Sequence, residues 1–311
     1  MRRCNRPALA GVAALLFTSS GHCAEAVVNV RAQAGSQHLQ AAELRWQHGP
    51  LRSVLAATRI DGDTHLRVNE LAYDTPLGNG FLTAGKKVMS WDVGYAFRPL
   101  DVVQREDRRA LNPLALEGVP MLAWESFDAD SATTIVWSNP GKGRAGDPRD
   151  DGAVAMRFYR QRGPRDEYAV LRLSKRNGIE AGASFSHVAS AGLELHGSLL
   201  WQQRPKHGGK AMAGFTYTTE ARFSAIGEIW VDRAAPQHQQ RNLMLRASQY
   251  VEDVEVSADM LWQPQSGSRI GTLSASWKTG PWLFSASYRR FSGIAARYQQ
   301  DVALASIQRG F

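Results

Sequence analysis

The sequence predicts an all-β protein, a transmembrane up-and-down antiparallel β-barrel. Two observations carry this prediction. Apolar and polar residues alternate along many short segments, as in LELHGSLLW at 193–201 and VEVSADMLW at 254–262. After the N-terminal region, no stretch approaches the roughly 18 consecutive apolar residues of a membrane helix. Successive side chains of a strand point to opposite faces, so each segment has one apolar and one mostly polar face.

Two kinds of protein use this alternation. In a soluble sandwich the apolar faces share a core and the polar faces meet water. In a membrane barrel the apolar face meets lipid and the polar face lines a lumen. The rest of the chain must decide between these two architectures.

The N-terminus predicts export. Arginines among the first six residues precede an apolar run over 8–17, and small polar residues follow it. Cleavage is expected after Ala24 or after Ala26, the latter closing an Ala-x-Ala site. We therefore expect a secretory signal peptide over 1–26 and a barrel over 27–311.

Composition excludes several classes of function. Both cysteines, Cys4 and Cys23, lie in the predicted signal peptide, so we expect neither a cysteine nucleophile nor a thiolate metal site. No metal-ligand spacing or cofactor motif is present in the sequence, and we expect no cofactor. The formal net charge is +8, but the arginines are dispersed without an aromatic-basic motif. Nucleic acid is therefore not an expected partner.

The mature chain divides into eighteen candidate strands. Turn residues separate many of them, as in Asp-Gly-Asp at 61–63 and Thr-Gly-Pro at 279–281. Bacterial barrels use an even number of strands, so we predict 16–18, with 14 as the lower alternative. The segments are 27–34, 38–48, 51–60, 63–72, 80–89, 119–127, 131–138, 153–161, 167–175, 179–188, 192–203, 211–220, 223–232, 241–250, 252–263, 269–278, 281–291 and 300–311.

The last segment, DVALASIQRGF at 301–311, resembles the C-terminal strand of Gram-negative outer-membrane β-barrels. In that family alternate residues are apolar and the terminal residue is aromatic, here Phe311. Arg309 departs from the pattern, because a hydrophobic residue or tyrosine usually stands there. The resemblance implies an outer-membrane location, contact with membrane lipid and lipopolysaccharide, and recognition by the barrel-assembly machinery through the strand ending in Phe311.

A second segment, GKKVMSWDVGYAFRPLD at 85–101, resembles part of the porin-like barrels of the alginate-export type. This resemblance favours a channel. The segment begins the longest stretch without alternation, a loop at about 91–118, and long loops inside compact folds are usually functional. If the loop folds inward it would narrow the pore; a solvated extracellular loop is the alternative. The candidate constriction residues are Arg98, Asp101, Arg105, Arg108 and Arg109.

Alternation also predicts which charged side chains face the lumen. Rings of fixed charge select solutes in pores, although mixed charge also simply keeps an interior hydrated. The candidate pore-lining residues are Arg31, Arg45, Arg52, Arg67, Lys87, Arg157, Arg172, Glu194, Arg246, Glu255, Asp259 and Arg289, and the same parity adds Glu43, Glu180, Glu228 and Lys278.

The sequence therefore predicts an outer-membrane channel for a small hydrophilic, anionic solute, and not an enzyme. One alternative is a barrel lipid hydrolase, because His196 and Ser198 resemble the His-x-Ser of outer-membrane phospholipases and lipid A deacylases. In those families the site faces lipid, whereas the parity of this segment places both residues inside. A second alternative is a soluble exported β-sandwich that binds a ligand.

Overall fold

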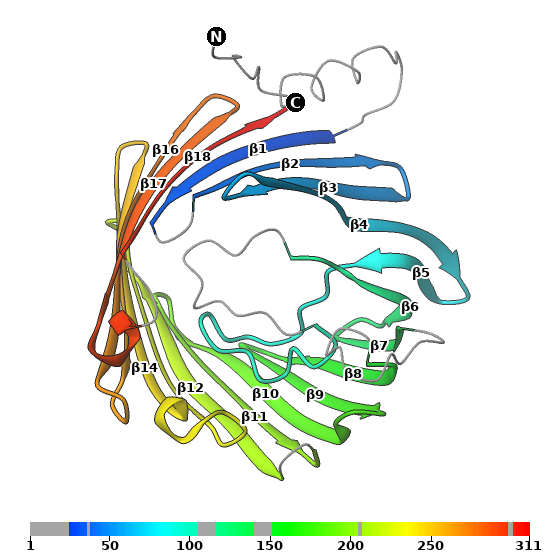
Figure 1. The fold of residues 1–311 in the computed structure, drawn as a ribbon. Helices are drawn as coiled ribbons and strands as arrows, with labels where there is room; N and C mark the ends of the chain where they lie inside the picture. Colours follow the sequence, from blue (N-terminus) through cyan, green and yellow to red (C-terminus); the bar gives the residue numbers. More distant parts are fainter. Residues whose placement is uncertain (1–24, 36–37, 105–115, 140–150, 205–206, 298–300) are drawn as a thin grey trace.

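The computed structural model is a closed barrel of eighteen antiparallel strands (Figure 1). It describes residues 25–35, 38–104, 116–139, 151–204, 207–297 and 301–311. Each strand pairs with its neighbour in sequence, and β1 pairs with β18 to close the ring. The strands are β1 Glu25–Ala34, β2 Leu39–His48, β3 Leu51–Ile60, β4 Asp63–Leu77, β5 Gly80–Lys87, β6 Val119–Phe127, β7 Ser131–Ser138, β8 Ala153–Arg162, β9 Arg165–Ser174, β10 Gly178–Ser190, β11 Leu193–Gln202, β12 Gly208–Thr218, β13 Phe223–Asp232, β14 Arg241–Val251, β15 Val254–Gln263, β16 Ser268–Thr279, β17 Trp282–Ser292 and β18 Val302–Gly310.

The predicted fold class is confirmed, at the upper end of the predicted strand number. Only two short 3-10 helices are found in the described residues, η3 (Gln237–Gln239) and η4 (Gly293–Arg297). No helix in this described part of the chain is long and apolar enough to cross a membrane. A single closed sheet replaces the two facing sheets that a sandwich requires, so the soluble sandwich is excluded.

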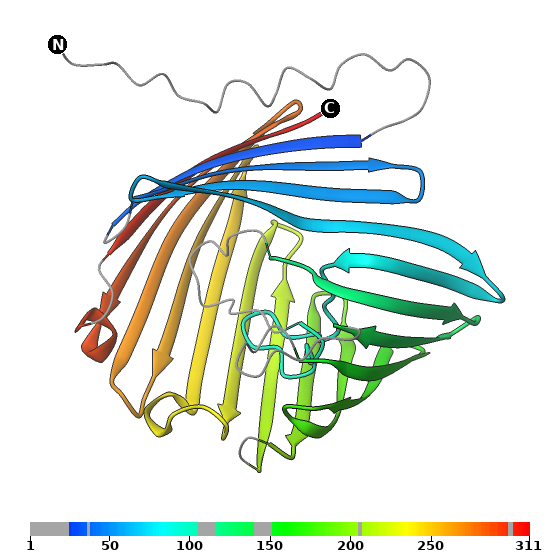
Figure 2. The same ribbon diagram turned by 45° about the vertical axis from the view of Figure 1, so that its right-hand side comes forward.

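The two ends of the barrel differ in the length of their connections. At the end that carries the first residue of β1 and the last residue of β18, most connections are two residues long, such as 163–164 and 280–281. At the other end they reach 88–118 and 139–152. Figure 2 shows the barrel turned by 45° from the view of Figure 1. Outer-membrane barrels have short periplasmic turns and longer extracellular loops, so we assign the long-loop end to the extracellular side.

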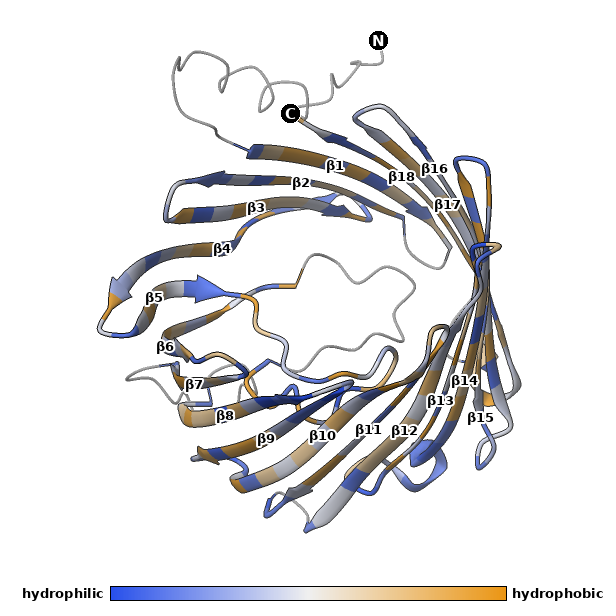
Figure 3. Ribbon diagram, turned by 180° about the vertical axis from the view of Figure 1, so that it is seen from behind, coloured by the Kyte–Doolittle hydropathy of each residue, from blue (hydrophilic) through white to orange (hydrophobic). Residues whose placement is uncertain are grey.

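The outer surface is apolar along each strand. Its exposed side chains include Leu66, Leu199, Ile229 and Leu273, which are 58–79% exposed. Figure 3 shows the hydrophobic and hydrophilic positions alternating around the barrel. A continuous exposed apolar belt on a closed barrel is unfavourable in water and is the surface that lipid requires.

The strand β1 begins before the predicted end of the signal peptide. Glu25 and Ala26 are already paired with Gln47 and Trp46 on β2, and the N–H of Phe311 donates to the carbonyl of Ala26 at 2.9 Å. Of the two predicted cleavage positions, the one after Ala24 keeps these pairs. Residues 1–24 lie outside the described residues, so the signal peptide stays a prediction.

Arg309, which departs from the family pattern in the last strand, has a clear structural role. Its guanidinium carbon lies 4.8 Å from the ring centre of Trp282 and 4.5 Å from that of Phe311. Register places Arg309 on the outer face, opposite Trp282 on β17 and Val28 on β1, at the periplasmic end. A cation stacked on aromatic rings at the membrane interface takes the place of the usual hydrophobic residue.

Replacing Gly85 with alanine should destabilise the barrel strongly. Gly85 has a φ of 133°, and a Cβ added there would lie 2.2 Å from the carbonyl oxygen of Leu71. The backbone conformation alone costs a residue with a Cβ about 1–3 kcal/mol, and the clash adds to it. A lower urea midpoint, followed by tryptophan fluorescence, is the expected result. Gly271→Ala is the matched control, because open space surrounds that position; equal midpoints for the two variants would contradict the argument.

Candidate functional site

The connection between β5 and β6 enters the barrel and packs against its inner wall (Figures 1 and 2). Of this loop, residues 88–104 and 116–118 are described. Leu100 and Val102 are buried against inward side chains of β6–β11, including Leu200. Phe97 stacks on Trp230 of β13, with ring centres 5.4 Å apart. The loop therefore covers the β6–β15 side of the lumen.

A buried carboxylate on the wall holds this part of the loop. Glu228 of β13 is 1% exposed and accepts hydrogen bonds from three successive loop amides, those of Tyr95, Ala96 (2.8 Å) and Phe97 (3.3 Å). His196 Nε2 lies 3.2 Å from the same carboxylate. Hydrogen bonds to a charged group are stronger than neutral ones, so Glu228 is the principal polar anchor of the loop.

Two carboxylates of the loop complete the attachment. Asp92 accepts hydrogen bonds from Ser198 Oγ on β11 and from the N–H of Leu100 at 2.7 Å. Asp101 accepts from the N–H of Trp91 at 2.5 Å and the N–H of Asp92 at 3.0 Å. Asp92 therefore ties the loop to the wall, while Asp101 closes the loop on itself.

The end of the loop returns beside β4 and β5. The N–H of Gly118 donates to the carbonyl of Asn69 at 2.8 Å. Asn69 is an extra residue on β4, where the β3–β4 register shifts between Val54 and Leu55. Lys86 Nζ binds Glu117 at 2.6 Å. Bulges commonly redirect a strand beside a functional site, and this one receives the returning loop.

Acidification should strengthen the part of the loop docking that depends on Asp92 and Asp101. Burial raises the pKa of both Asp92 and Asp101, against the opposing effect of their backbone hydrogen bonds. A carboxyl with a raised pKa holds its proton more tightly in the docked state than in the released state. Docking therefore gains stability as the pH falls from the raised pKa toward the ordinary value of 3.8, and loses it as the pH rises through the raised value.

The measurement is single-channel recording at stepped pH. As the pH falls through this window, excursions to higher conductance, caused by release of the loop, should become rarer relative to those of a variant that lacks both carboxylates. The double variant Asp92→Asn/Asp101→Asn should lose this dependence. If the excursions of the unmodified protein instead become more frequent than those of the double variant as the pH falls, the sign is wrong.

The serine and histidine of the hydrolase alternative are both anchors of the loop. Ser198 and His196 are 6% and 4% exposed and lie beneath the loop. Ser198 donates to Asp92, and His196 contacts Glu228. A nucleophilic serine needs a base within hydrogen-bond reach and an accessible oxygen. Ser198 instead donates to the Asp92 carboxylate, His196 is bound to Glu228, and the serine oxygen is buried, so the two residues do not form a nucleophile–base pair.

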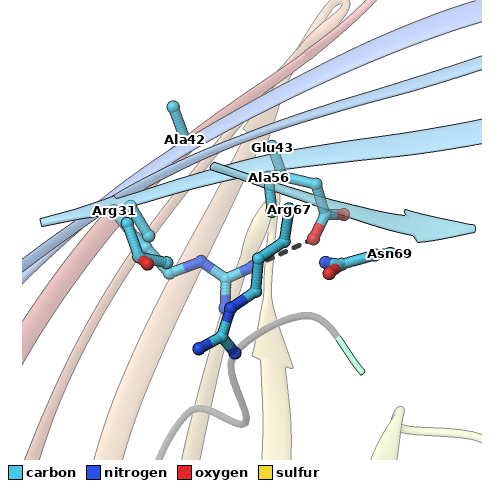
Figure 4. A pocket seen from close by; sticks show the side chains of 8 residues that line it. Arg31, Ala42, Glu43, Ala56, Arg67 and Asn69 are labelled. Atoms are coloured by element: carbon cyan, nitrogen blue, oxygen red, sulfur yellow. Dashed lines mark ion pairs between the residues drawn. The ribbon is translucent and has the colours of Figure 1, made fainter. Parts of the chain in front are cut away.

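The opposite part of the inner wall, on β1–β4, carries a group of arginines. Arg31, Arg67 and Asn69 line a pocket together with Glu43 (Figure 4). Arg45 Nε lies 2.5 Å from Glu43 Oε1, and Arg31 lies 3.8 Å from Glu43 Oε2. The side chains of Arg45 and Arg67 are 62% and 51% exposed. We call Arg31, Arg45, Arg67 and Glu43 the arginine cluster; Arg31 and Arg45 share the buried carboxylate of Glu43, and Arg67 lines the same pocket as Arg31 and Glu43.

The other predicted pore residues divide by their partners. Arg172 is buried between Asp151 (2.9 Å) and Glu180, so its charge is neutralised within the wall. Arg246 pairs with Asp259 at 3.1 Å and Glu255 at 3.6 Å. The remaining contacts are Lys87 with Asp74 at 3.9 Å, Arg157 over the Tyr168 ring at 5.3 Å, Glu194 with Ser186 at 2.7 Å, Arg289 with Thr272 at 3.0 Å, and Arg98 with Asp101 at 3.8 Å. Arg52 lies half-buried on the same face as Arg45, and Arg105, Arg108 and Arg109 fall outside the described residues.

Sequence reasoning missed the apolar half of the inner wall. Met212, Trp230 and Met244 face inward and are 4–5% exposed beneath the loop. A signal was present in the sequence, because Leu200 and Leu261 stand at positions where the alternation calls for polar residues. Apolar residues on the lumen face of several strands indicate that something covers that face.

Comparison with known proteins identifies the fold and no closer relationship. No protein-family model and no curated protein matches the chain. Among solved structures it is similar to Wzi, an Escherichia coli outer-membrane protein involved in group 1 capsule assembly, at 10% identity and a TM-score of 0.68, over 93% of this chain and 85% of Wzi. It is also similar to Pseudomonas aeruginosa OccK1, at 10% identity and a TM-score of 0.65, over 94% of this chain and 100% of OccK1. The similarity to OprD from the same organism has 8% identity and a TM-score of 0.64, over 93% of this chain and 95% of OprD. With its closed sheet and apolar belt, the chain has the architecture of porin-like outer-membrane β-barrels.

Proposed function

We propose that the protein is a passive outer-membrane channel for small hydrophilic anions. The observation that carries this proposal is the arginine cluster. Its guanidinium groups outnumber the Glu43 carboxylate, and two of its side chains stay more than half exposed. Excess positive charge on an inner wall attracts anions and repels cations. The loop covers the other side of the lumen, so solutes would pass on the side of β1–β4.

The ion pair between Arg67 and Glu117 leaves this excess largely in place. Arg67 lies 3.9 Å from Glu117, and both side chains are substantially exposed. Exposed pairs at such a distance interact weakly. Glu117 also binds Lys86 more closely, at 2.6 Å. Arg67 therefore keeps a guanidinium group that a permeating carboxylate or phosphate can contact.

One structural neighbour adds support from outside this chain. OpdK of Pseudomonas aeruginosa, 10% identical with a TM-score of 0.65, has been solved with vanillate, which is an aromatic carboxylate. A barrel of this architecture can therefore hold a small organic anion. The resemblance of 85–101 to alginate-export barrels stays a prediction.

The proposal is tested with proteoliposomes placed in isosmotic solutions of solutes of matched size. Swelling should be fast with a small carboxylate, slower with a neutral sugar, and slowest with an organic cation. Equal swelling rates for all three solutes would show that the arginines do not select anions. No swelling with any solute, from protein of confirmed β content, would contradict the channel itself.

A further inference from the structure

Four exposed arginines gather at the extracellular rim, on the outside of the barrel. Arg241 begins β14, Arg269 stands at the start of β16, Arg290 lies near the end of β17, and Arg297 ends η4. Three of them belong to the outward face of the sheet. Arg241 is opposite the exposed Val231, Arg269 is opposite the exposed Trp262, and Arg290 follows the exposed Tyr288 by two residues. We call this group the rim patch.

Register brings these side chains close together. Arg290 is opposite Gly271, which is two residues from Arg269 on the neighbouring strand. Such diagonal positions are roughly 7–8 Å apart, within the combined reach of two arginines. Arg241 lies on the far side of β15, about two strand spacings from Arg269. One phosphorylated headgroup can therefore contact Arg269 and Arg290, with Arg241 beside it.

The charge of the rim patch is largely uncompensated. Within the described part of the chain, Arg241, Arg269 and Arg297 form no ion pair. Arg290 lies near Asp301, whose carboxylate accepts hydrogen bonds from the Tyr288 hydroxyl at 2.6 Å and the Phe291 N–H at 3.1 Å. The patch thus keeps excess positive charge at the level of the lipid headgroups.

Apolar side chains lie directly below the arginines on the same outward face. Trp262, Leu273 and Tyr288 are 38%, 63% and 47% exposed, and Leu245 is 46% exposed. A partner that fits both layers carries anionic groups above and hydrocarbon chains below. A soluble anion would use only the arginines, and a neutral lipid would use only the belt.

We propose that the rim patch binds a phosphorylated glycolipid of the outer leaflet, the lipid A part of lipopolysaccharide. Its phosphates contact Arg269 and Arg290, with Arg241 and Arg297 flanking them, and its acyl chains cover the belt around Leu273. Guanidinium groups form paired hydrogen bonds with phosphate oxygens, which makes this contact stronger than a simple attraction of charges. The inference depends on the orientation of the barrel and is independent of the proposed transport.

The test titrates the purified full barrel in detergent with diphosphoryl lipid A and counts bound lipid by native mass spectrometry. The variant Arg269→Gln/Arg290→Gln is compared with Arg59→Gln/Arg160→Gln. The control has the same loss of charge, and both of its arginines are exposed on the outward face of other strands. We expect lipid A to bind roughly tenfold or more weakly to the rim-patch variant and unchanged to the control.

Three results would overturn the proposal. Unchanged binding to the rim-patch variant would show that these arginines do not contact the lipid. An equal loss in both variants would reduce the effect to net charge. Complete displacement of lipid A by millimolar inorganic phosphate would show a phosphate site without a lipid surface. Retained heat-modifiable migration of both variants on gels establishes that they are folded.

Discussion

Replacing Glu228 with alanine is expected to release the loop from the wall and to raise the single-channel conductance. The substitution leaves three loop amides and His196 without their shared acceptor. Each hydrogen bond to a charged group contributes about 1.5–3 kcal/mol, so loss of even two shifts the docked population by more than tenfold. The apolar contacts of Phe97 and Leu100 remain, so we expect alternation between two conductance levels.

The matched control for this variant is Glu125→Ala. Glu125 of β6 also faces the lumen, but its carboxylate accepts a hydrogen bond from Thr134 of the wall and not from the loop. The Glu125→Ala channel should keep a single conductance level. If Glu228→Ala behaves like Glu125→Ala, the loop does not depend on this carboxylate.

Reversing two charges of the arginine cluster should reverse the ion selectivity. In the native protein, three guanidinium groups and Glu43 give the cluster a formal charge of +2. After Arg45→Glu/Arg67→Glu, one guanidinium group and three carboxylates give −2. Fixed charge on a narrow wall determines which ion enters. The reversal potential in a salt gradient should therefore change from the anion side to the cation side.

The control for this reversal places the same charge changes on the outer face, as Arg59→Glu/Arg160→Glu. Arg59 shares its hairpin with Arg67, but it lies on the face of the exposed Leu55. The Arg59→Glu/Arg160→Glu variant should keep the ion selectivity of the unmodified protein. An unchanged reversal potential after Arg45→Glu/Arg67→Glu would place the ion path elsewhere.

The sequence predicted the barrel because its signals are local. Alternation is read within one strand, and turn residues are read at its ends, so eighteen segments could be recognised one at a time. The predicted strand boundaries differ from the observed ones where a contact between distant parts of the sequence decides the local structure. The strand β1 starts at Glu25, because its first residues pair with β2 and because Ala26 also bonds to Phe311, nearly the whole chain away.

The loop anchors could be selected only in part from sequence. Glu228 fell on the inward face by parity, like many other charged residues, and nothing near it in sequence indicates the amides of Tyr95–Phe97, more than 130 residues earlier. Nothing in the sequence distinguishes Asp92, because a carboxylate in a loop is ordinarily solvated. Leu200 and Leu261 were the available clue, as apolar residues on a wet face.

The most direct test of the proposed path uses a single cysteine, because the chain beyond Cys23 contains none. Arg67→Cys is recorded as a single channel, and a membrane-impermeant sulfonated thiol reagent is added. If ions pass beside β1–β4, the current should fall in one irreversible step. Ala57→Cys, on the lipid-facing side of β3 opposite Leu66, should give no step. An undiminished current through Arg67→Cys channels that carry the label would contradict the proposed path.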